Sequence, residues 1–417
     1  MKISECEICY SFSLVTQAHA DIAVVGAGPA GAWAAYLLAR RGARILLFDP
    51  SHPREKPCGG GVTRRALAVI EEAVPARSLP AVRIDSVRLL AEGGRRSAVV
   101  PLTNGGLLAP LIVVSRRDFD SHLLLAARGA GAELVAARVT DVSRDGRGIC
   151  IRTADGVTRT ARWLVGADGA NSLVRRRFSR PFRRNELSIA TGFYAHGLTS
   201  KEIVIEIVHR PPGYIWSFPR PDHLAIGICA QADGGTGAAA LQAQTAAWIG
   251  ATGIGEGARL EPYSWPIPSF PAGDFDALTI AGPGWLLVGD AAGLADPVTR
   301  EGIFFALESA RHAAAAFGAG IDPEREYRMR VRDTIARELA RAGRLKASFF
   351  QPRFTELLID ALLQSEGVRT VIADLIAGTQ GYRGLAWRLA RTMEVGLTWK
   401  FLRLRTEIQS SQLRAHS

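Results

Sequence analysis

At residues 21–38 the chain reads DIAVVGAGPAGAWAAYLL, an apolar run that passes through a glycine turn into a segment of small residues. The run predicts a buried parallel strand over 22–25, and the small residues predict a helix over 30–40 that packs closely on it. A second apolar run, over 44–48, ends at Asp49, about twenty residues after the glycine turn. We therefore expect a βαβ unit of the dinucleotide-binding type.

The glycine turn predicts where a pyrophosphate binds. Glycine lets the backbone approach the phosphates, and the start of the following helix is electropositive. Asp49 has the spacing of an acid that accepts hydrogen bonds from the adenosine ribose. A glycine turn without a ligand is the alternative. The residues expected to contact the cofactor here are Gly26, Gly28, Pro29, Ala30, Gly31 and Asp49.

A second fragment, far along the chain, predicts the other half of the same site. Residues 285–303 read WLLVGDAAGLADPVTREGI, so a strand leads to Gly289 and Asp290. This carboxylate suits a ribityl or ribose hydroxyl. Glu301 and Gly302 open a new helix, whose first amides would face the flavin pyrimidine, so Gly302 and Ile303 are expected to contact the cofactor; a capping role alone is the alternative. Together the two fragments indicate FAD and not free NAD.

The pattern between and after these fragments predicts the fold class. Residues 182–265 alternate strands with Pro and Gly turns, as in an antiparallel sheet inserted into a nucleotide-binding domain. We expect an α/β protein: a Rossmann-like FAD-binding domain with an inserted antiparallel β-sheet substrate domain and C-terminal helices. The predicted ranges are 21–80, 110–180 and 280–320 for the FAD-binding domain, 81–109 and 181–279 for the substrate domain, and 321–417 for the helical region.

Composition narrows the class of protein. The chain has 417 residues, 47% of them hydrophobic, enough for more than one domain. Cys6 and Cys9 form a lone CxxC without a partner pair, so we expect neither a disulfide framework nor a metal site. Glu5 and Glu7 interrupt the apolar segment that an export signal needs, and no separate run is long enough for a transmembrane span. A cytoplasmic location follows.

The net charge of +11, carried mostly by arginine, has two interpretations. One is biased codon usage; the other is attraction to anionic lipids or diphosphate groups. No nucleic-acid-reading module is visible, so nucleic acid is not an expected partner. Residues 381–408, GYRGLAWRLARTMEVGLTWKFLRLRTEI, interleave apolar and basic residues. They predict either a helix lying on the inner face of an anionic membrane, as a peripheral contact, or a helix packed on the protein's own core.

The order of the motifs resembles a known superfamily. GxGxxG, the R-x-x-F-D segment that begins at Arg116, the Asp168–Gly169 turn and the Gly289–Asp290 segment occur in the order of para-hydroxybenzoate-hydroxylase-like FAD proteins. The resemblance implies that Arg116 contacts the cofactor, and that Asp168 and Gly169 lie near the FAD and the nicotinamide path. A surface salt bridge is the alternative for Arg116.

Two further segments resemble the geranylgeranyl reductases within that superfamily. Residues 57–61, PCGGG, are similar to the CGGG loop of those enzymes. Residues 211–219, PPGYIWSFP, followed by Ile226 and Gly227, are similar to their P-x-x-Y-x-W-x-F-P substrate signature. The resemblance covers about residues 21–316. Arg300 departs from it, because a small residue is expected there in a T-G-x-G pattern; the arginine either crowds the flavin edge or offers a charge to the substrate.

The resemblance implies reduction of isoprenoid carbon–carbon double bonds by hydride from reduced flavin, with NADPH or another reductant as electron donor. An isolated double bond lacks a group that accepts hydride, so we expect proton transfer to lead. Tyr214 and Trp216 would stabilise cationic character through their aromatic faces, and Cys58 or Tyr214 would relay the proton. Tyr214, Trp216 and Phe218 would contact the isoprenoid or lipid substrate. A hydrophobic sheet face and a tight-loop cysteine are the structural alternatives.

Two other classes of function stay open. An FAD-dependent monooxygenase or halogenase is one, because residues 214–219, YIWSFP, are similar to the W-x-W-x-I-P motif of halogenases; those enzymes need a lysine near the substrate, and none lies between Lys56 and Lys201. A non-enzymatic prenyl-binding protein, like the GDP-dissociation inhibitors, is the other; the intact Asp49, Asp168 and Asp290 argue against it.

Overall fold

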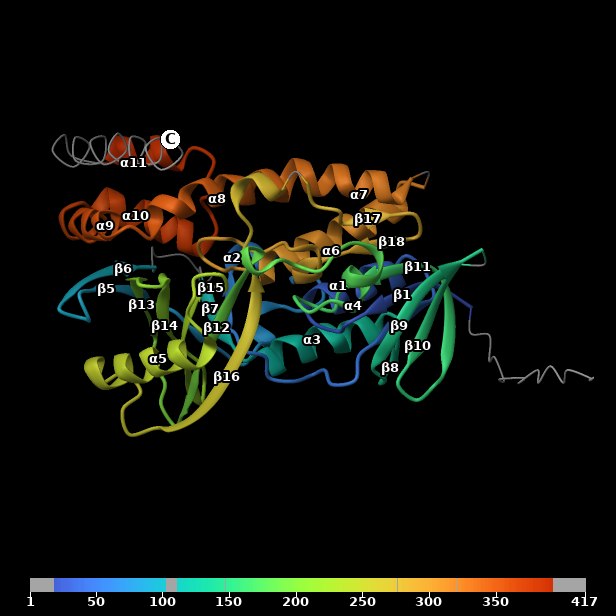
Figure 1. Cartoon of the computed structure of the whole chain (residues 1–417), viewed down its shortest axis with the longest axis horizontal. Coiled ribbons are helices and arrows are strands. Elements are labelled where there is room, and N and C mark those ends of the chain that lie inside the picture. The colour runs from blue at the N-terminus through green and yellow to red at the C-terminus, as the bar shows by residue number, and fades with distance from the viewer. Residues whose placement is uncertain (1–18, 103–110, 147, 276, 321, 393–417) are drawn as a thin grey trace, which may run out of the picture.

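The predicted βαβ unit forms at the start of the structure. A computed structural model describes residues 19–102, 111–146, 148–275, 277–320 and 322–392 (Figure 1). In it, β1 (His19–Val25) leads through the glycine turn into α1 (Pro29–Ala39) and then into β2 (Ile45–Phe48). β1 and β2 pair in parallel, with Ile22 opposite Ile45. The apolar runs become strands because both faces of this sheet are covered.

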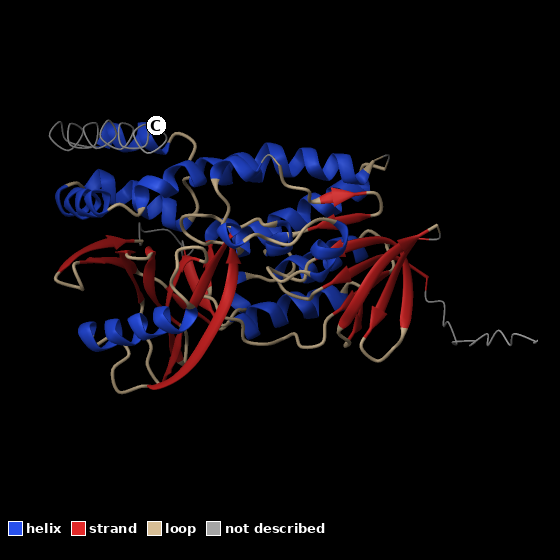
Figure 2. Ribbon diagram, in the orientation of Figure 1, coloured by secondary structure: helices blue, strands red, loops and turns tan. Residues whose placement is uncertain are grey.

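The first sheet has eight strands among the described residues and is parallel at its centre, in the order β17-β18-β11-β1-β2-β8, with β9 and β10 joined to β11 (Figure 2). β11 pairs in parallel with β1 on one side and with β18 on the other, so the segments that follow these three strands meet at one edge. Its other strands are β8 (Glu133–Val135), β9 (Val139–Asp145), β10 (Gly148–Thr153), β11 (Thr158–Gly166), β17 (Ala281–Gly282) and β18 (Trp285–Leu287).

The second sheet is the predicted antiparallel insertion, in the order β16-β12-β15-β14-β13-β5-β6, with one parallel pair between β5 and β13. Tyr214, Trp216 and Phe218 alternate along β14 and share one face, while Ile215 packs on the other face with Trp248 of α5 (Ala238–Thr252). The strands are β5 (Ser86–Ala91), β6 (Arg96–Pro101), β12 (Leu187–His196), β13 (Glu202–His209), β14 (Pro212–Pro219), β15 (His223–Gln231) and β16 (Arg259–Pro268).

The two sheets and the helices around them confirm the predicted α/β fold class, whereas the domain boundaries stay a prediction. A small third sheet has the order β3-β7-β4. Its strands β3 and β4 precede β5 in sequence and β7 follows β6, so it connects the first sheet to the second in both directions of the chain. Its strands, and the helices not yet given, are β3 (Gly61–Thr63), β4 (Ala81–Arg83), β7 (Leu111–Val114), α2 (Arg64–Ile70), α3 (Arg116–Gly129), α4 (Leu173–Phe178) and α6 (Ile303–Gly318).

The last helices lie along one side of both sheets (Figure 1). They are α7 (Pro323–Val331), α8 (Arg337–Phe349), α9 (Pro352–Gln364), α10 (Glu366–Ala377) and α11 (Leu385–Thr392). Leu358 and Ile359 of α9 share an apolar cluster with Val87 and Leu89 of β5. This part of the chain therefore covers the second sheet, which we call the substrate sheet because it carries the residues predicted to contact the substrate, Tyr214, Trp216 and Phe218.

The predicted terminal features fall largely outside this structure. Cys6 and Cys9 lie outside the described residues, and so does the part of the basic segment 381–408 that follows Thr392. Within the described ranges, no helix combines the length and apolar character that crossing a membrane requires. Trp387 of α11 is 66% exposed, with Arg391 stacked 4.5 Å from its ring centre. Peripheral membrane contact stays a prediction.

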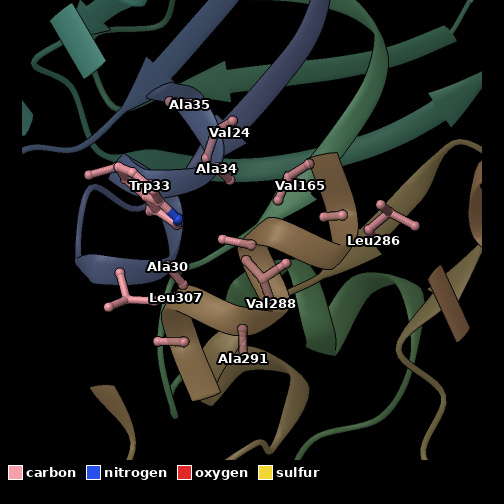
Figure 3. Packing of buried hydrophobic residues seen from close by; sticks show 14 of the residues in the cluster. Val24, Ala30, Trp33, Ala34, Ala35, Val165, Leu286, Val288, Ala291 and Leu307 are labelled. Carbon is pink, nitrogen blue, oxygen red and sulfur yellow. The ribbon is translucent and has the colours of Figure 1, made fainter. Parts of the chain in front are cut away.

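Small residues allow the core around the glycine turn to close (Figure 3). Ala30 and Ala34 of α1, Val165 of β11 and Leu307 of α6 belong to one buried cluster. A Cβ on Gly31 would lie 1.8 Å from the carbonyl oxygen of Gly26. α1 can approach the sheet only because that atom is missing.

Replacing Gly31 by alanine should therefore lower the free energy of unfolding by about 2–3 kcal/mol, because backbone must move to admit the methyl group. Urea unfolding followed by circular dichroism measures the change. Gly129→Ala in α3 is the matched control: its Cβ meets nothing within 4 Å, so helix propensity should stabilise the protein by no more than about 1 kcal/mol. Equal effects of the two variants would contradict the packing argument.

Candidate active site

A continuous cavity of about 1660 Å³ runs from the glycine turn to the C-terminal helices. Its volume exceeds the 300–1,000 Å³, roughly, of most small-molecule sites. Of the predicted residues, all but Gly31 and Gly289 line it; these two pack behind the turn, where a Cβ on Gly289 would lie 2.9 Å from the Ala30 side chain. Within the described parts of the chain, no group of acidic, histidine and cysteine side chains has the arrangement of a metal site.

The start of α1 fits the pyrophosphate of FAD. Gly28 caps this helix without a side-chain hydrogen bond, Pro29 follows it, and the first turn contains no acid. A Cβ on Gly28 would have only the His52 and Arg116 side chains within 4 Å, at 3.8 and 3.9 Å. The helix amides therefore face open space beside positive charge, as an anion requires.

Asp49, the predicted ribose ligand, is already engaged in the turn that follows β2. Its Oδ1 accepts hydrogen bonds from the amides of Ser51 and His52, both at 2.8 Å. Its Oδ2 accepts one from the amide of Ala27 at 2.9 Å and lies 2.8 Å from His52 Nδ1. A ribose hydroxyl would have to share these oxygens, so ribose binding by Asp49 stays a prediction.

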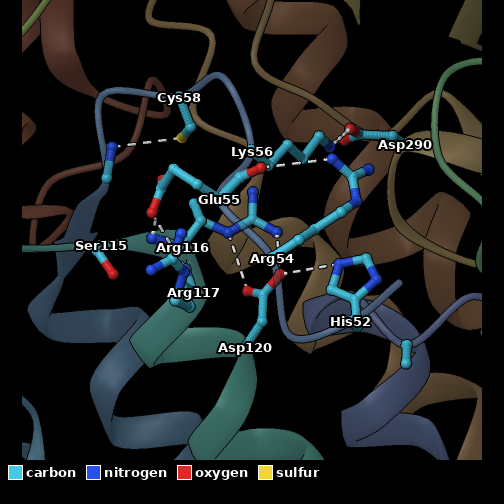
Figure 4. A network of polar contacts seen from close by, with 12 residues as sticks. His52, Arg54, Glu55, Lys56, Cys58, Ser115, Arg116, Arg117, Asp120 and Asp290 are labelled. Atoms are coloured by element: carbon cyan, nitrogen blue, oxygen red, sulfur yellow. Dashed lines mark hydrogen bonds and ion pairs between the residues drawn. The ribbon is translucent and has the colours of Figure 1, made fainter. Parts of the chain in front are cut away.

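His52 links this acid to a second buried carboxylate (Figure 4). Its Nε2 lies 3.2 Å from Asp120, which also forms a two-pronged ion pair with Arg116 at 2.9 and 2.7 Å. Burial would lower the pKa of His52, but its hydrogen bonds to Asp120 and Asp49 raise it above the usual value. Sequence analysis missed His52; a histidine three residues after the ribose acid was the available signal.

Arg116 is a buried residue of the cavity wall, and the alternative of a surface salt bridge is wrong. Only 4% of the residue is exposed. Burial alone would lower its pKa, yet the charge of Asp120 raises it, so the guanidinium stays charged. Fixed by Asp120, this cation lies where a phosphate would approach the start of α1.

The linkage predicts a pH dependence. Because the folded-state pKa of His52 lies above the unfolded one, its stabilising effect is complete below about pH 6.5 and is lost as the pH rises through the folded-state value. The stability advantage of the wild type over His52→Gln should therefore shrink as the pH rises above about 6.5. Urea unfolding of both proteins on either side of that pH checks it, and a constant difference would show that folding leaves the pKa of His52 unchanged.

Asp168 and Gly169 divide two tasks at the end of β11. Asp168 accepts hydrogen bonds from the Ser172 hydroxyl and from the amides of Leu173 and Val174, the latter two at 2.6 and 3.1 Å, and so holds the start of α4. Burial raises its pKa. Gly169 has φ +78 and open space around its Cβ position, next to the cavity. A role of this turn near the nicotinamide path stays a prediction.

Asp290 lies beside the start of α6, with its Oδ2 3.2 Å from Lys56 Nζ (Figure 4). A Cβ on Gly302 would lie 3.3 Å from Asp290 Oδ1, so glycine keeps room for the carboxylate at the helix start. α6 begins at Ile303 with Gly302 as its N-cap, directly after the predicted opening at Glu301 and Gly302. Sequence analysis missed Lys56 as a site residue, because it lies far from Asp290 in the sequence and no local motif links the two.

The glycine-rich loop is shaped by the aromatic residue of the substrate signature. Phe218 covers it: a Cβ on Gly59 would lie 3.0 Å from the Phe218 ring, and one on Gly61 would lie 3.1 Å from it. Gly60 has φ +82 and donates its amide to Cys58 Sγ at 3.3 Å. The two motifs that pointed to one family are thus parts of one contact.

Arg220 and Glu55 lock the same loop to the substrate sheet. Arg220, fully buried, pairs with Glu55 and donates to the Cys58 carbonyl at 2.6 Å. Glu55 also accepts the amide of Arg116 at 3.2 Å. Sequence analysis missed both residues; the signal was an arginine directly after the Phe-Pro of a buried strand.

Tyr214 and Trp216 form the aromatic wall of the cavity, with ring centres 5.7 Å apart. The Tyr214 hydroxyl donates to the Thr299 carbonyl at 2.6 Å, and burial raises its pKa well above the usual value. Gly227 of the signature lies beneath Trp216: its Cβ would come within 2.6 Å of that ring and 2.5 Å of the Tyr263 hydroxyl. The alternative for these aromatic residues, a hydrophobic sheet face, describes the same feature, because this sheet face forms part of the cavity wall.

Comparison with known proteins agrees with this geometry. The family model described as "FAD binding domain" matches residues 19–325. A menaquinone reductase of Mycolicibacterium smegmatis is 29% identical over 377 residues, 85% of this chain and 90% of that protein. A geranylgeranyl diphosphate reductase of Rhodobacter capsulatus is 31% identical over 307 residues, 71% of this chain and 74% of that one.

Solved structures share the fold. A geranylgeranyl bacteriochlorophyll reductase-like protein of Thermoplasma acidophilum superimposes with a TM-score of 0.73 at 22% identity, covering 90% of this chain and 99% of its own. Flavin-dependent halogenases and a monooxygenase have the same fold at lower TM-scores. At these identities the likeness to solved structures concerns the fold alone.

Proposed function

We propose that this chain, which belongs to the geranylgeranyl reductase family of FAD-dependent oxidoreductases, reduces carbon–carbon double bonds of an isoprenoid chain. The observation that carries the proposal is the extension of the cofactor cavity into a long apolar space under the C-terminal helices. A dinucleotide site alone would not need it, whereas a prenyl chain requires apolar walls along its length.

The apolar part of the cavity lies between the substrate sheet and the last helices. β5 and β13 supply one wall, and α9, α10 and α11 supply the other. No charged side chain interrupts the apolar residues that line it from these elements, which are Val87, Leu89, Ile203, Ile205, Ile207, Phe354, Leu358, Ala361, Val368, Ile372, Leu375, Ile376, Leu385, Ala386, Leu389 and Ala390.

Bound FAD would supply the hydride, and NADPH or another reductant would supply its electrons. The amides at the start of α1 and the Arg116 guanidinium would hold the pyrophosphate. Asp49 and Asp290 would meet hydroxyls of the cofactor, and the start of α6 at Gly302 and Ile303 would face the ring.

Tyr214 and Trp216 would stabilise positive charge on the isoprenoid, and Phe218 would hold the glycine loop against it. The Tyr214 hydroxyl already donates to Thr299, and its raised pKa disfavours proton loss. Cys58, on the cavity wall beside Phe218, is therefore the better proton relay of the two residues considered.

The function is tested by anaerobic reduction of the flavin-loaded protein, followed by incubation with prenyl substrates and mass spectrometry. Each reduced bond should add two mass units to the substrate. The panel should include a prenyl quinone and a geranylgeranyl diphosphate, because relatives are named for them. Flavin that stays reduced beside every unchanged prenyl substrate would contradict the proposal.

The aromatic wall is tested separately. Replacing Tyr214 and Trp216 together by leucine should lower the rate of alkene reduction by about 30- to 1000-fold, because each ring face is worth about 1–2 kcal/mol to a desolvated cation and the variant loses both. FAD should stay bound. Tyr214→Phe is the matched control, which keeps the ring and should keep most of the rate.

The same assay examines the proton relay. Cys58→Ala should slow turnover by at least about 100-fold, since a positioned proton donor contributes about that much or more. Full activity in the alanine variant would remove Cys58 from the reaction, and a large loss in Tyr214→Phe would return the relay to the tyrosine.

Oxygen uptake with product hydroxylation or halogenation would favour the monooxygenase or halogenase alternative, whose solved members share this fold. Lys56 lines the cavity, but its ammonium group is paired with Asp290, which disfavours a halogenase role for it. A colourless protein that still binds prenyl groups would favour the non-enzymatic alternative.

A further inference from the structure

Arg300 occupies a strained and buried position on the cavity wall. It has φ +60, in the left-handed region that an L side chain rarely adopts, and only 8% of the residue is exposed. A glycine would take this backbone conformation without strain. Strain of this kind persists where the surrounding structure over-determines it, often at functional sites.

The guanidinium of Arg300 has no carboxylate partner. Its Nη1 donates to the Pro297 carbonyl, and its buried Nε has no hydrogen-bond partner. Among the residues that the structure describes, no acid forms an ion pair with it within 4.0 Å. It lies beside the buried thiol of Cys229 and the ring of Tyr214, facing the substrate sheet. Burying a cation without a counterion costs free energy of desolvation, and binding of an anion beside Arg300 would offset that cost.

A second, half-buried cation lies near it. Lys346 of α8 donates to Gln231 Oε1 at 2.6 Å and to Ser269 Oγ at 2.9 Å, both neutral acceptors. Burial, and then the nearby charge of Arg300, lower the pKa of Lys346 to about 7. Two cations that repel each other are kept together here.

The acids that face this pair do not neutralise it. Asp296 is buried, and its Oδ1 accepts the amides of Val298 and Thr299 at 2.7 and 2.9 Å. Asp233 is exposed and forms no described ion pair with Lys346, although its charge raises the lysine pKa slightly against the other effects. The local field inside the cavity is therefore positive.

We propose that Arg300, supported by Lys346, binds an oxyanion at the head of the isoprenoid substrate, a carboxylate or a phosphate. The inference rests on the proposed function, since the apolar space beyond Tyr214 takes the tail. Arg300 lines the cavity and offers its guanidinium group to the anion, and Lys346 supplies longer-range attraction. Arg300 is then the residue that selects anionic over neutral prenyl chains.

The proposal is tested by calorimetric binding to the oxidised, flavin-loaded protein, with geranylgeranyl diphosphate, geranylgeranoic acid and geranylgeraniol as probes. Arg300→Gly should weaken binding of both anions by about 10- to 100-fold, the usual loss for a hydrogen bond to a charged group, and should leave the alcohol within about threefold. Arg300→Lys should recover part of the loss. Whichever of the two anions binds the wild-type protein more tightly identifies the head group as a phosphate or a carboxylate.

Arg95→Gly is the matched control: it removes the same charge from an exposed turn outside the cavity and should change none of the three affinities. The flavin midpoint potential is measured in each variant. Equal losses for the alcohol and the anions, or a shifted potential with unchanged selectivity, would overturn the proposal and assign Arg300 to the flavin edge.

The outcomes separate this inference from the proposed function. Anion binding that depends on Arg300, without reduction of any double bond, would leave the anion site standing and reject the reductase. Reduction of the alcohol as well as the anions, unaffected by Arg300→Gly, would keep the reductase and reject the anion site.

Discussion

The close approach of two backbone segments at the glycine turn is the constraint on which the rest of the structure depends. Gly26 has φ +100, and a Cβ there would lie 2.4 Å from the carbonyl oxygen of Ala167. This contact joins β1 to β11, and β18 pairs with β11 on the far side. The carboxyl ends of all three strands therefore meet, which is where open α/β sheets bind their ligands.

The cofactor loop and the substrate sheet are coupled through Phe218 and Arg220. Phe218 packs on Gly59 and Gly61, where a Cβ would lie only 3.0 and 3.1 Å from its ring, and Arg220 holds the loop through Glu55 and the Cys58 carbonyl. A change on either side of this contact would be transmitted to the other, because packed interiors have little free volume. The cofactor half and the substrate half of the cavity are in this sense one site.

Buried charges are treated differently in its two halves. Near the glycine turn, Arg116, Asp120, His52 and Asp49 form a chain in which each charge has an opposite neighbour. Near the substrate sheet, Arg300 has no such neighbour among the residues that the structure describes. The paired chain keeps the turn rigid, whereas the unpaired cation leaves binding energy for a ligand.

The sequence by itself determined the βαβ unit, the strand that precedes Gly289 and Asp290, a helix that begins next to Gly302, and the shared face of Tyr214, Trp216 and Phe218. These follow from local patterns, namely glycine spacing and the periods of strand and helix. Only the tertiary structure showed that His52 forms a hydrogen bond with Asp49, that Lys56 forms an ion pair with Asp290, and that the last helices form one wall of the cavity. Such contacts join residues far apart in the chain, and no local pattern carries them because they arise only when separate elements pack together.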